Sequence, residues 1–184
     1  MENSNNTEIT PLPIEDLIKR CHQSAVDGGW WHDINTGEKL DRNDGELRML
    51  IISEIAEAME GLRKDLMDDK LPHRKMEEVE LADTVIRICD YIGSSEIEFS
   101  INGYKDTVNN AVAWGVDEKN ACNLYNMVAF VVYGEEVKVL SLITFYSHHK
   151  GYDLLGAINE KLEYNAIRAD HKPENRKKAG GKAF

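Results

Sequence analysis

Two segments with helical apolar spacing, joined by a short connection, constrain the fold of this chain most. Residues 45–66 carry apolar side chains every three or four positions, as on the buried stripe of a helix: Leu47, Ile51, Ile55, Ala58, Met59 and Leu62. Pro72 interrupts this pattern. A second helix is expected over residues 76–92, ending at Gly93. Together the two segments predict a helical hairpin.

Further helices are expected around this hairpin. Their approximate bounds are 13–27, 117–133, 135–150 and 153–170. Between them, polar and apolar residues alternate over residues 96–101 as in a short strand, whereas the pattern of residues 104–114 suits a helix. The predicted fold class is therefore all-α, a helical bundle built on the hairpin. The segment 94–151 is a helical insertion in it, which could extend the bundle, form a dimer surface or act as a lid.

The length of the chain indicates a single domain spanning residues 1–184. Polar residues 1–10 are expected to form a flexible N-terminal tail, and basic residues 173–184 a mobile C-terminal one. No apolar run approaches the roughly 20 residues that cross a bilayer, and the first residues lack the apolar core of an export signal. We therefore expect a cytoplasmic protein without a membrane partner.

The charge balance narrows the possible functions. A net charge of -11 argues against a nucleic-acid partner, because such binding depends on Lys and Arg that neutralise phosphates.

The three cysteines, Cys21, Cys89 and Cys122, are scattered and odd in number, so they fit no disulfide framework. We expect them to be reduced.

Two acidic pairs, each with a spacing of three residues, lie on the two helices of the predicted hairpin. Glu54 and Glu57 belong to the first helix, and Glu80 and Asp83 to the second. The carboxylates of a pair are about 60° apart around the helix, so both can reach one point. Four converging carboxylates repel one another unless a cation lies among them, and oxygen ligands favour Mg²⁺ or Mn²⁺. The alternative is a solvated face of an acidic protein.

The last predicted helix carries cationic side chains and an amide, in contrast to the acidic pairs of the hairpin. Lys161, Asn165, Arg168 and Lys172 form one stripe if the helix extends that far. Such side chains suit phosphate oxygens, although an exposed basic edge would give the same pattern. Acidic metal ligands combined with a basic stripe indicate a metal-bound polyphosphate.

These segments resemble a known family. The stretches LIISEIAEAMEGLR, EEVELADTVIRICDYIG and EKLEYNAIR are similar to the MazG-like nucleoside triphosphate pyrophosphohydrolases of the all-α NTP pyrophosphatase superfamily. The family pattern is ExxE, then ExxD, then a helix with Lys, Asn and Arg. In this chain it falls on Glu54, Glu57, Glu80, Asp83, Lys161, Asn165 and Arg168.

The resemblance implies a Mg²⁺-dependent hydrolase that converts a nucleoside triphosphate to its monophosphate and pyrophosphate. The four acids would be the catalytic metal ligands, Lys161 and Arg168 would hold phosphate oxygens, and Asn165 would bond to phosphate or sugar. It also implies a homodimer or homotetramer. The match covers residues 45–93 and 152–172, and it departs from the pattern at Ser53, where many members carry a further Glu.

The substrate is less constrained than the reaction. A purine deoxynucleotide such as dGTP is expected, with a dUTP or dUDP hydrolase using the same acids as one alternative and a non-enzymatic helical interaction module as another. Trp30 and Trp31 precede the first acidic helix. They could stack on a nucleobase, or they could anchor the core.

Overall fold

The computed structural model describes residues 9–95, 99–111, 122–168 and 173–177. The helices in this part of the chain are α1 (Ile14–Asp27), α2 (Asp44–Lys64), α3 (Met76–Ser94), α4 (Ile101–Asn109), α5 (Cys122–Tyr133), α6 (Glu136–Lys150), α7 (Leu154–Ile167) and α8 (Pro173–Arg176). Among the described residues there is no strand, only two isolated β-bridges. The predicted all-α class is confirmed. The predicted strand is not formed by residues 99–101, and residues 96–98 lie outside the described part.

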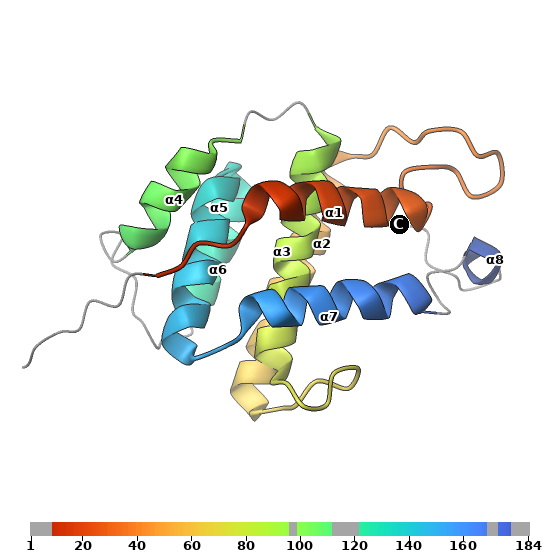
Figure 1. The fold of residues 1–184 in the computed structure, drawn as a ribbon. Helices are drawn as coiled ribbons and strands as arrows, with labels where there is room; N and C mark the ends of the chain where they lie inside the picture. Colours follow the sequence, from red (N-terminus) through yellow and green to blue (C-terminus); the bar gives the residue numbers. More distant parts are fainter. Residues whose placement is uncertain (1–8, 96–98, 112–121, 169–172, 178–184) are drawn as a thin grey trace, which may run out of the picture.

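Helix α3 is the centre of the structure. It packs against α1, α2, α6 and α7. In Figure 1, α1 and α7 cross one side of α3 while α2 lies behind it. The apolar side chains that define the core face of α3 are all buried, at Leu81, Val85, Ile88 and Ile92. Because α3 has neighbours around most of its circumference, several of its polar residues are also buried, namely Glu77, Glu78, Glu80 and Thr84.

The predicted hairpin is formed by α2 and α3, which make the most extensive helix pair of the structure. Asn43 caps α2, since its side chain accepts a hydrogen bond from the backbone N–H of Glu46 at 3.1 Å. Leu47, Ile51 and Ile55 are buried as expected. The prediction was wrong for Met59, which is 39% exposed. It lies about 80° from the centre of the apolar stripe and so misses α3.

The glycine at the end of α3 has a different role from the one predicted. Gly93 does not end the helix, which continues to Ser94. A Cβ atom at this position would lie 2.6 Å from the Cβ of His22 on α1. The glycine therefore allows α1 to approach α3 closely.

Helices α4, α5 and α6 occupy the segment predicted as an insertion. α4 and α5 pack on α6, α5 also contacts α2, and α6 contacts α3 (Figure 1). Two fully buried tyrosines, Tyr104 and Tyr146, belong to this part of the core. The hydroxyl of Tyr104 accepts a hydrogen bond from the backbone N–H of Leu12 at 3.0 Å. The predicted helix start at Asp117 falls outside the described residues, and α5 is described from Cys122.

The two ends of the described chain differ from the prediction. Ile9, which was assigned to the flexible tail, is buried in the core. Arg176, which was assigned to the mobile basic tail, is only 6% exposed. α7 ends at Ile167 and not near residue 170, because Arg168 has an extended backbone. No helix in the described ranges combines the length and the apolar character that crossing a membrane requires.

The contact between α2 and the start of α3 leads to a first prediction. A Cβ atom at Gly61 would lie 2.7 Å from the backbone nitrogen of Glu77 and 2.9 Å from the Cβ of Met76. Backbone cannot move aside as a side chain can, so Gly61→Ala should lower the free energy of unfolding by about 1–3 kcal/mol. The loss outweighs the gain of about 1 kcal/mol that alanine brings to a helix. Chemical denaturation of wild type and variant measures the difference.

The control is the same substitution near the other end of α2. At Gly45 a Cβ would meet only the side-chain oxygen of Asn43, at 3.0 Å. Gly45→Ala should therefore change stability little. Equal stability of wild type and Gly61→Ala would contradict the close approach of the two helices.

Candidate functional site

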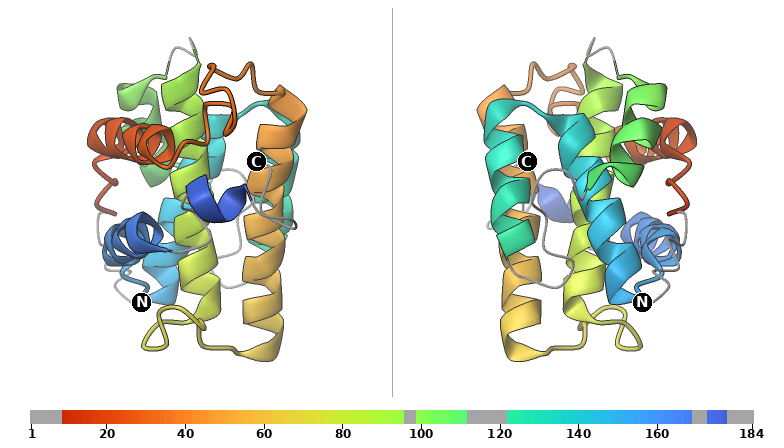
Figure 2. Two further views of the ribbon diagram at one scale, coloured as in Figure 1. Left: turned by 90° about the vertical axis from the view of Figure 1, so that its right-hand side faces the viewer. Right: turned by 90° about the vertical axis from the view of Figure 1, so that its left-hand side faces the viewer.

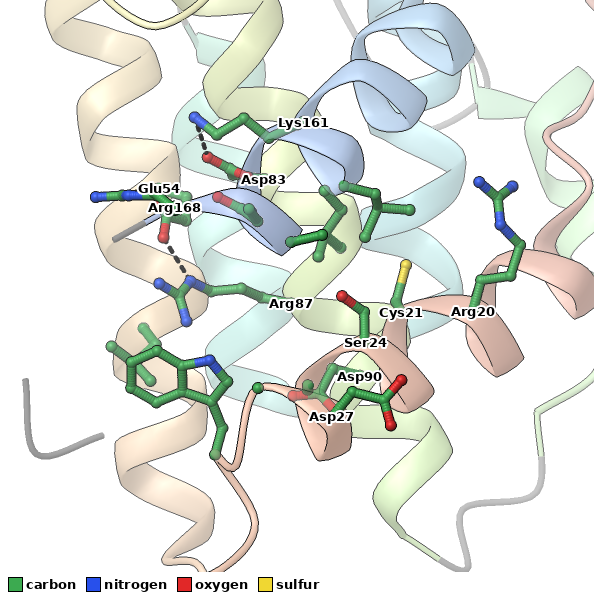
Figure 3. Close-up of a pocket in the computed structure, with 18 of the residues that line it drawn as sticks. Arg20, Cys21, Ser24, Asp27, Glu54, Asp83, Arg87, Asp90, Lys161 and Arg168 are labelled. Carbon is green, nitrogen blue, oxygen red and sulfur yellow. Dashed lines mark hydrogen bonds and ion pairs between the residues drawn. The ribbon is translucent and has the colours of Figure 1, made fainter. Parts of the chain in front are cut away.

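A pocket of about 1210 Å³ lies among α1, α2, α3 and α7. Figure 3 shows side chains from these helices converging on it, with Glu54, Asp83 and Lys161 in one part and Asp90 and Asp27 in another. Its volume exceeds the range of roughly 300–1,000 Å³ that small-molecule sites in proteins commonly have. The pocket is therefore spacious enough for a ligand of nucleotide size.

All four predicted acids line this pocket, and three of them converge on one point. One carboxylate oxygen from each of Glu54, Glu57 and Glu80 lies within 4.8 Å of the other two. α2 supplies the first two residues, and α3 supplies the third. Ligand oxygens on opposite sides of a Mg²⁺ ion are about 4.2 Å apart, since each bond is about 2.1 Å. The spacing suits one hard divalent cation after a small closing movement.

The fourth acid, Asp83, has a different partner. Its Oδ2 lies 2.7 Å from the Nζ of Lys161 on α7, and the Lys161 side chain is only 6% exposed. In the structure a lysine ammonium neutralises Asp83, and the sharing of one cation by all four carboxylates stays a prediction. Burial nevertheless raises the pKa of Asp83, and Lys161 opposes this shift.

Glu80 is the most perturbed acid of the group. Burial, and then the neighbouring carboxylate of Asp83, raise its pKa to about 8. The side chain has no hydrogen-bond or ion-pair partner among the described residues, and Lys161 lowers the pKa only in part. A carboxyl group of this kind retains a proton at neutral pH unless a cation replaces that proton.

An arginine that the sequence analysis did not identify completes the acidic site. The Nε of Arg87 on α3 is paired with a carboxylate oxygen of Glu54 (Figure 3). Arg87 follows Asp83 by one helical turn and so lies on the same face of α3. This spacing was visible in the sequence and could have indicated the residue.

The predicted basic stripe is only partly formed by α7. Lys161 and Arg168 line the pocket, and so does Asn165, whose Oδ1 is buried without a hydrogen-bond partner among the described residues. The stripe does not extend four helical turns, because α7 ends at Ile167. Lys172 lies outside the described residues.

The two tryptophans have separate roles. Trp31 is a buried anchor whose Nε1 donates a hydrogen bond to Oδ1 of Asp90 at 3.0 Å. Of the two roles considered for the tryptophans, Trp31 therefore has that of a core anchor and does not face a ligand. Trp30 lines the pocket, and the guanidinium carbon of Arg176 lies 3.6 Å from the centre of its ring. Arg176 also donates to the backbone carbonyls of Gly28 and Gly29, both at 3.1 Å.

No known family model matches the chain, and neither a curated protein nor a solved structure shows significant similarity to it. These comparisons therefore assign no function to the site.

The raised pKa of Glu80 predicts that stability falls as the pH rises. The folded state keeps the carboxyl protonated up to about pH 8, whereas the unfolded chain loses this proton near 4.5. Between these values the folded state binds more protons, so the free energy of unfolding decreases with pH. One unit of pKa difference corresponds to about 1.4 kcal/mol. In a chelator, the melting temperature of Glu80→Gln should fall less than that of wild type between about pH 5 and pH 8.5.

Glu60→Gln provides the control for this comparison. Glu60 lies on α2 and forms ion pairs with Arg63 and Lys64 on the protein surface. Its removal should leave the fall in melting temperature over this pH range as large as in wild type. Parallel pH profiles of wild type and Glu80→Gln would show that Glu80 titrates normally.

Proposed function

We propose that the protein hydrolyses a nucleoside triphosphate to the monophosphate and pyrophosphate with Mg²⁺ as its cofactor, and that Mn²⁺ can substitute. The observation that carries the proposal is the convergence of Glu54, Glu57 and Glu80 beside the buried Lys161 in a large pocket. An acidic group beside cationic side chains is what a complex of a divalent cation with a polyphosphate requires.

The three convergent carboxylates are suited to hold the cation. Their donors are all oxygens, the ligands that Mg²⁺ prefers. The raised pKa of Glu80 supports this fit, because a divalent cation would relieve the repulsion that the proton now relieves. When bound, Mg²⁺ would neutralise phosphate charge and lower the pKa of a coordinated water.

Several cations of the pocket are placed to bind the phosphates. Lys161, Arg168, Lys70 and Arg87 line it together with the acids. Asp83 holds the ammonium group of Lys161 in position, so that its charge is fixed before a ligand arrives. The unpartnered Oδ1 of Asn165 would accept a hydrogen bond from a sugar hydroxyl.

The resemblance to the MazG-like enzymes supports the same assignment. It gives metal-binding roles to the acids of α2 and α3 and phosphate-binding roles to residues of α7. A helical interaction module, by contrast, would not need a buried carboxyl with a pKa near 8 beside two further carboxylates. Such a group is unfavourable for folding, and it occurs more often in functional sites than elsewhere.

Release of pyrophosphate from a panel of ribo- and deoxyribonucleoside triphosphates tests the proposal. With Mg²⁺, wild type should release pyrophosphate from at least one of them. Glu57→Gln should lower kcat/KM at least about a hundredfold, since it removes one of the three carboxylates that would bind the cation. Asp83→Asn should lower kcat/KM by a similar factor, because Lys161 would no longer be held in position.

Glu60→Gln is the matched control, because it removes a carboxylate one helical turn further along α2 without touching the pocket. It should retain full activity. Glu57 is exposed, so its variant should melt as wild type does, and Asp83→Asn is checked by the same measurement. No turnover of any triphosphate with Mg²⁺ or Mn²⁺ would exclude the proposed reaction.

Replacement of Arg87 should change metal binding and turnover in opposite directions. The arginine occupies a carboxylate oxygen of Glu54, so it competes with a divalent cation for that residue. Arg87→Gln should strengthen Mn²⁺ binding roughly threefold to tenfold, as expected for a partly exposed ion pair. Because Arg87 is also placed to bind a phosphate, the same variant should lower kcat/KM. Paramagnetic titration with Mn²⁺ and the pyrophosphate assay measure the two effects, and weaker Mn²⁺ binding would contradict the competition.

A further inference from the structure

We propose that the part of the pocket formed by Asp90, Arg42 and Trp30 binds a guanine base. This inference rests on the proposed function, in which the acids and Lys161 bind the triphosphate of the same ligand. It adds the chemical class of the base, which the acids alone do not define. All three residues line the same pocket as the acids.

One carboxylate oxygen of Asp90 is hydrogen-bonded to neighbouring side chains, and the other is available to a ligand. His22 Nδ1 lies 2.8 Å from its Oδ1, and the indole N–H of Trp31 donates to the same atom at 3.0 Å. The Asp90 side chain is only 17% exposed. Its Oδ2 has no hydrogen-bond partner among the described residues. A mostly buried carboxylate oxygen is unfavourable without donors, so a ligand that supplies them is stabilised.

Arg42 presents the complementary group. Its Nη2 is buried and has no acceptor among the described residues, while Nη1 donates weakly to the carbonyl of Trp30 at 3.5 Å. The guanidinium lies over the ring of Trp31, 5.4 Å from its centre, which fixes its position. Burial lowers the pKa of Arg42, and the nearby charge of Asp90 opposes this shift, so the two groups influence each other electrostatically. This part of the pocket thus combines an unused acceptor with an unused donor.

Guanine is the base whose edge matches this pair. Its exocyclic amino group can donate to the available Oδ2, its neighbouring N1–H points toward the same carboxylate, and its O6 acceptor lies beside them. Cytosine and adenine each place a ring-nitrogen lone pair next to their amino group, which a carboxylate repels. In uracil and thymine the single N–H lies between two carbonyl oxygens. Asp90 therefore favours guanine, and O6 can accept from Arg42.

Trp30 supplies an aromatic surface in the same region. Arg176 lies against its ring and binds the backbone carbonyls of Gly28 and Gly29. These contacts hold the indole in place before a ligand binds. A fixed indole at the wall of a pocket is a suitable stacking partner for a nucleobase.

The test is binding of deoxynucleoside monophosphates, which needs neither hydrolysis nor a metal. Isothermal titration of wild type with dGMP, dAMP, dCMP and dUMP should give the tightest binding for dGMP, at least about tenfold tighter than for the others. Asp90→Asn should weaken dGMP binding about ten- to a hundredfold, because the amide nitrogen replaces the free acceptor.

The same variant should gain affinity for the monophosphate of deoxyxanthosine. Its side-chain oxygen remains bonded to His22 and Trp31, so the amide N–H₂ takes the place of Oδ2. Xanthine carries a carbonyl where guanine carries its amino group, and this carbonyl accepts from the amide. A purely structural role of Asp90 would not produce this reversal. Asp27→Asn, the same change at another carboxylate of the pocket, should keep the preference for dGMP.

The outcomes separate this inference from the proposed reaction. Selective dGMP binding that depends on Asp90, without turnover of dGTP, would support the base assignment and overturn the hydrolase proposal. Turnover of triphosphates by a protein that binds the four monophosphates equally would support the hydrolase proposal and overturn the base assignment. Loss of affinity for all of them in Asp90→Asn, with no gain for deoxyxanthosine monophosphate, would also overturn the guanine site.

Discussion

The burial of carboxylates along α3 is the interaction on which the rest of the site depends. α3 is enclosed by other helices, so its acids lie in surroundings that disfavour charge. α7 compensates one of them by placing Lys161 against Asp83, and Arg87 compensates Glu54 across the hairpin. Glu80 has no such partner among the described residues, and its pKa rises accordingly. The carboxyl group whose burial no cation fully compensates thereby lies where three carboxylates converge.

The segment between the hairpin and α7 explains how this burial is sustained. None of the described residues of α4, α5 or α6 lines the pocket. These helices instead support the hairpin from its other side, where Arg48 on α2 donates to the carbonyl of Val131 at 2.7 Å and pairs with Glu136. Tyr146 donates to the buried carboxylate of Glu77 on α3 at 2.6 Å. Of the three roles considered for the insertion, an extension of the bundle is the one that these contacts describe.

Periodicity predicted the helices and the face on which each acid lies, because both are local properties of the chain. It predicted neither the pairing of Asp83 with Lys161 nor that of Glu54 with Arg87, since these depend on how the side chains lie after the helices have packed. Gly93 illustrates the same limit. A glycine near the end of a helical pattern commonly indicates its termination, whereas here it permits contact with α1, and only the position of His22 distinguishes the two.

One face of α3 connects the two parts of the pocket. Glu80, Asp83, Arg87 and Asp90 recur at spacings of three and four and lie within about 80° of one another around the helix. A rise of 1.5 Å per residue places the first and last of them about 15 Å apart along the axis. No small anion or single metal ion can contact both ends of this row. A ligand that uses the acids at one end and Asp90 at the other must be elongated and must carry anionic groups and hydrogen-bond donors at separate places, as a nucleoside triphosphate does.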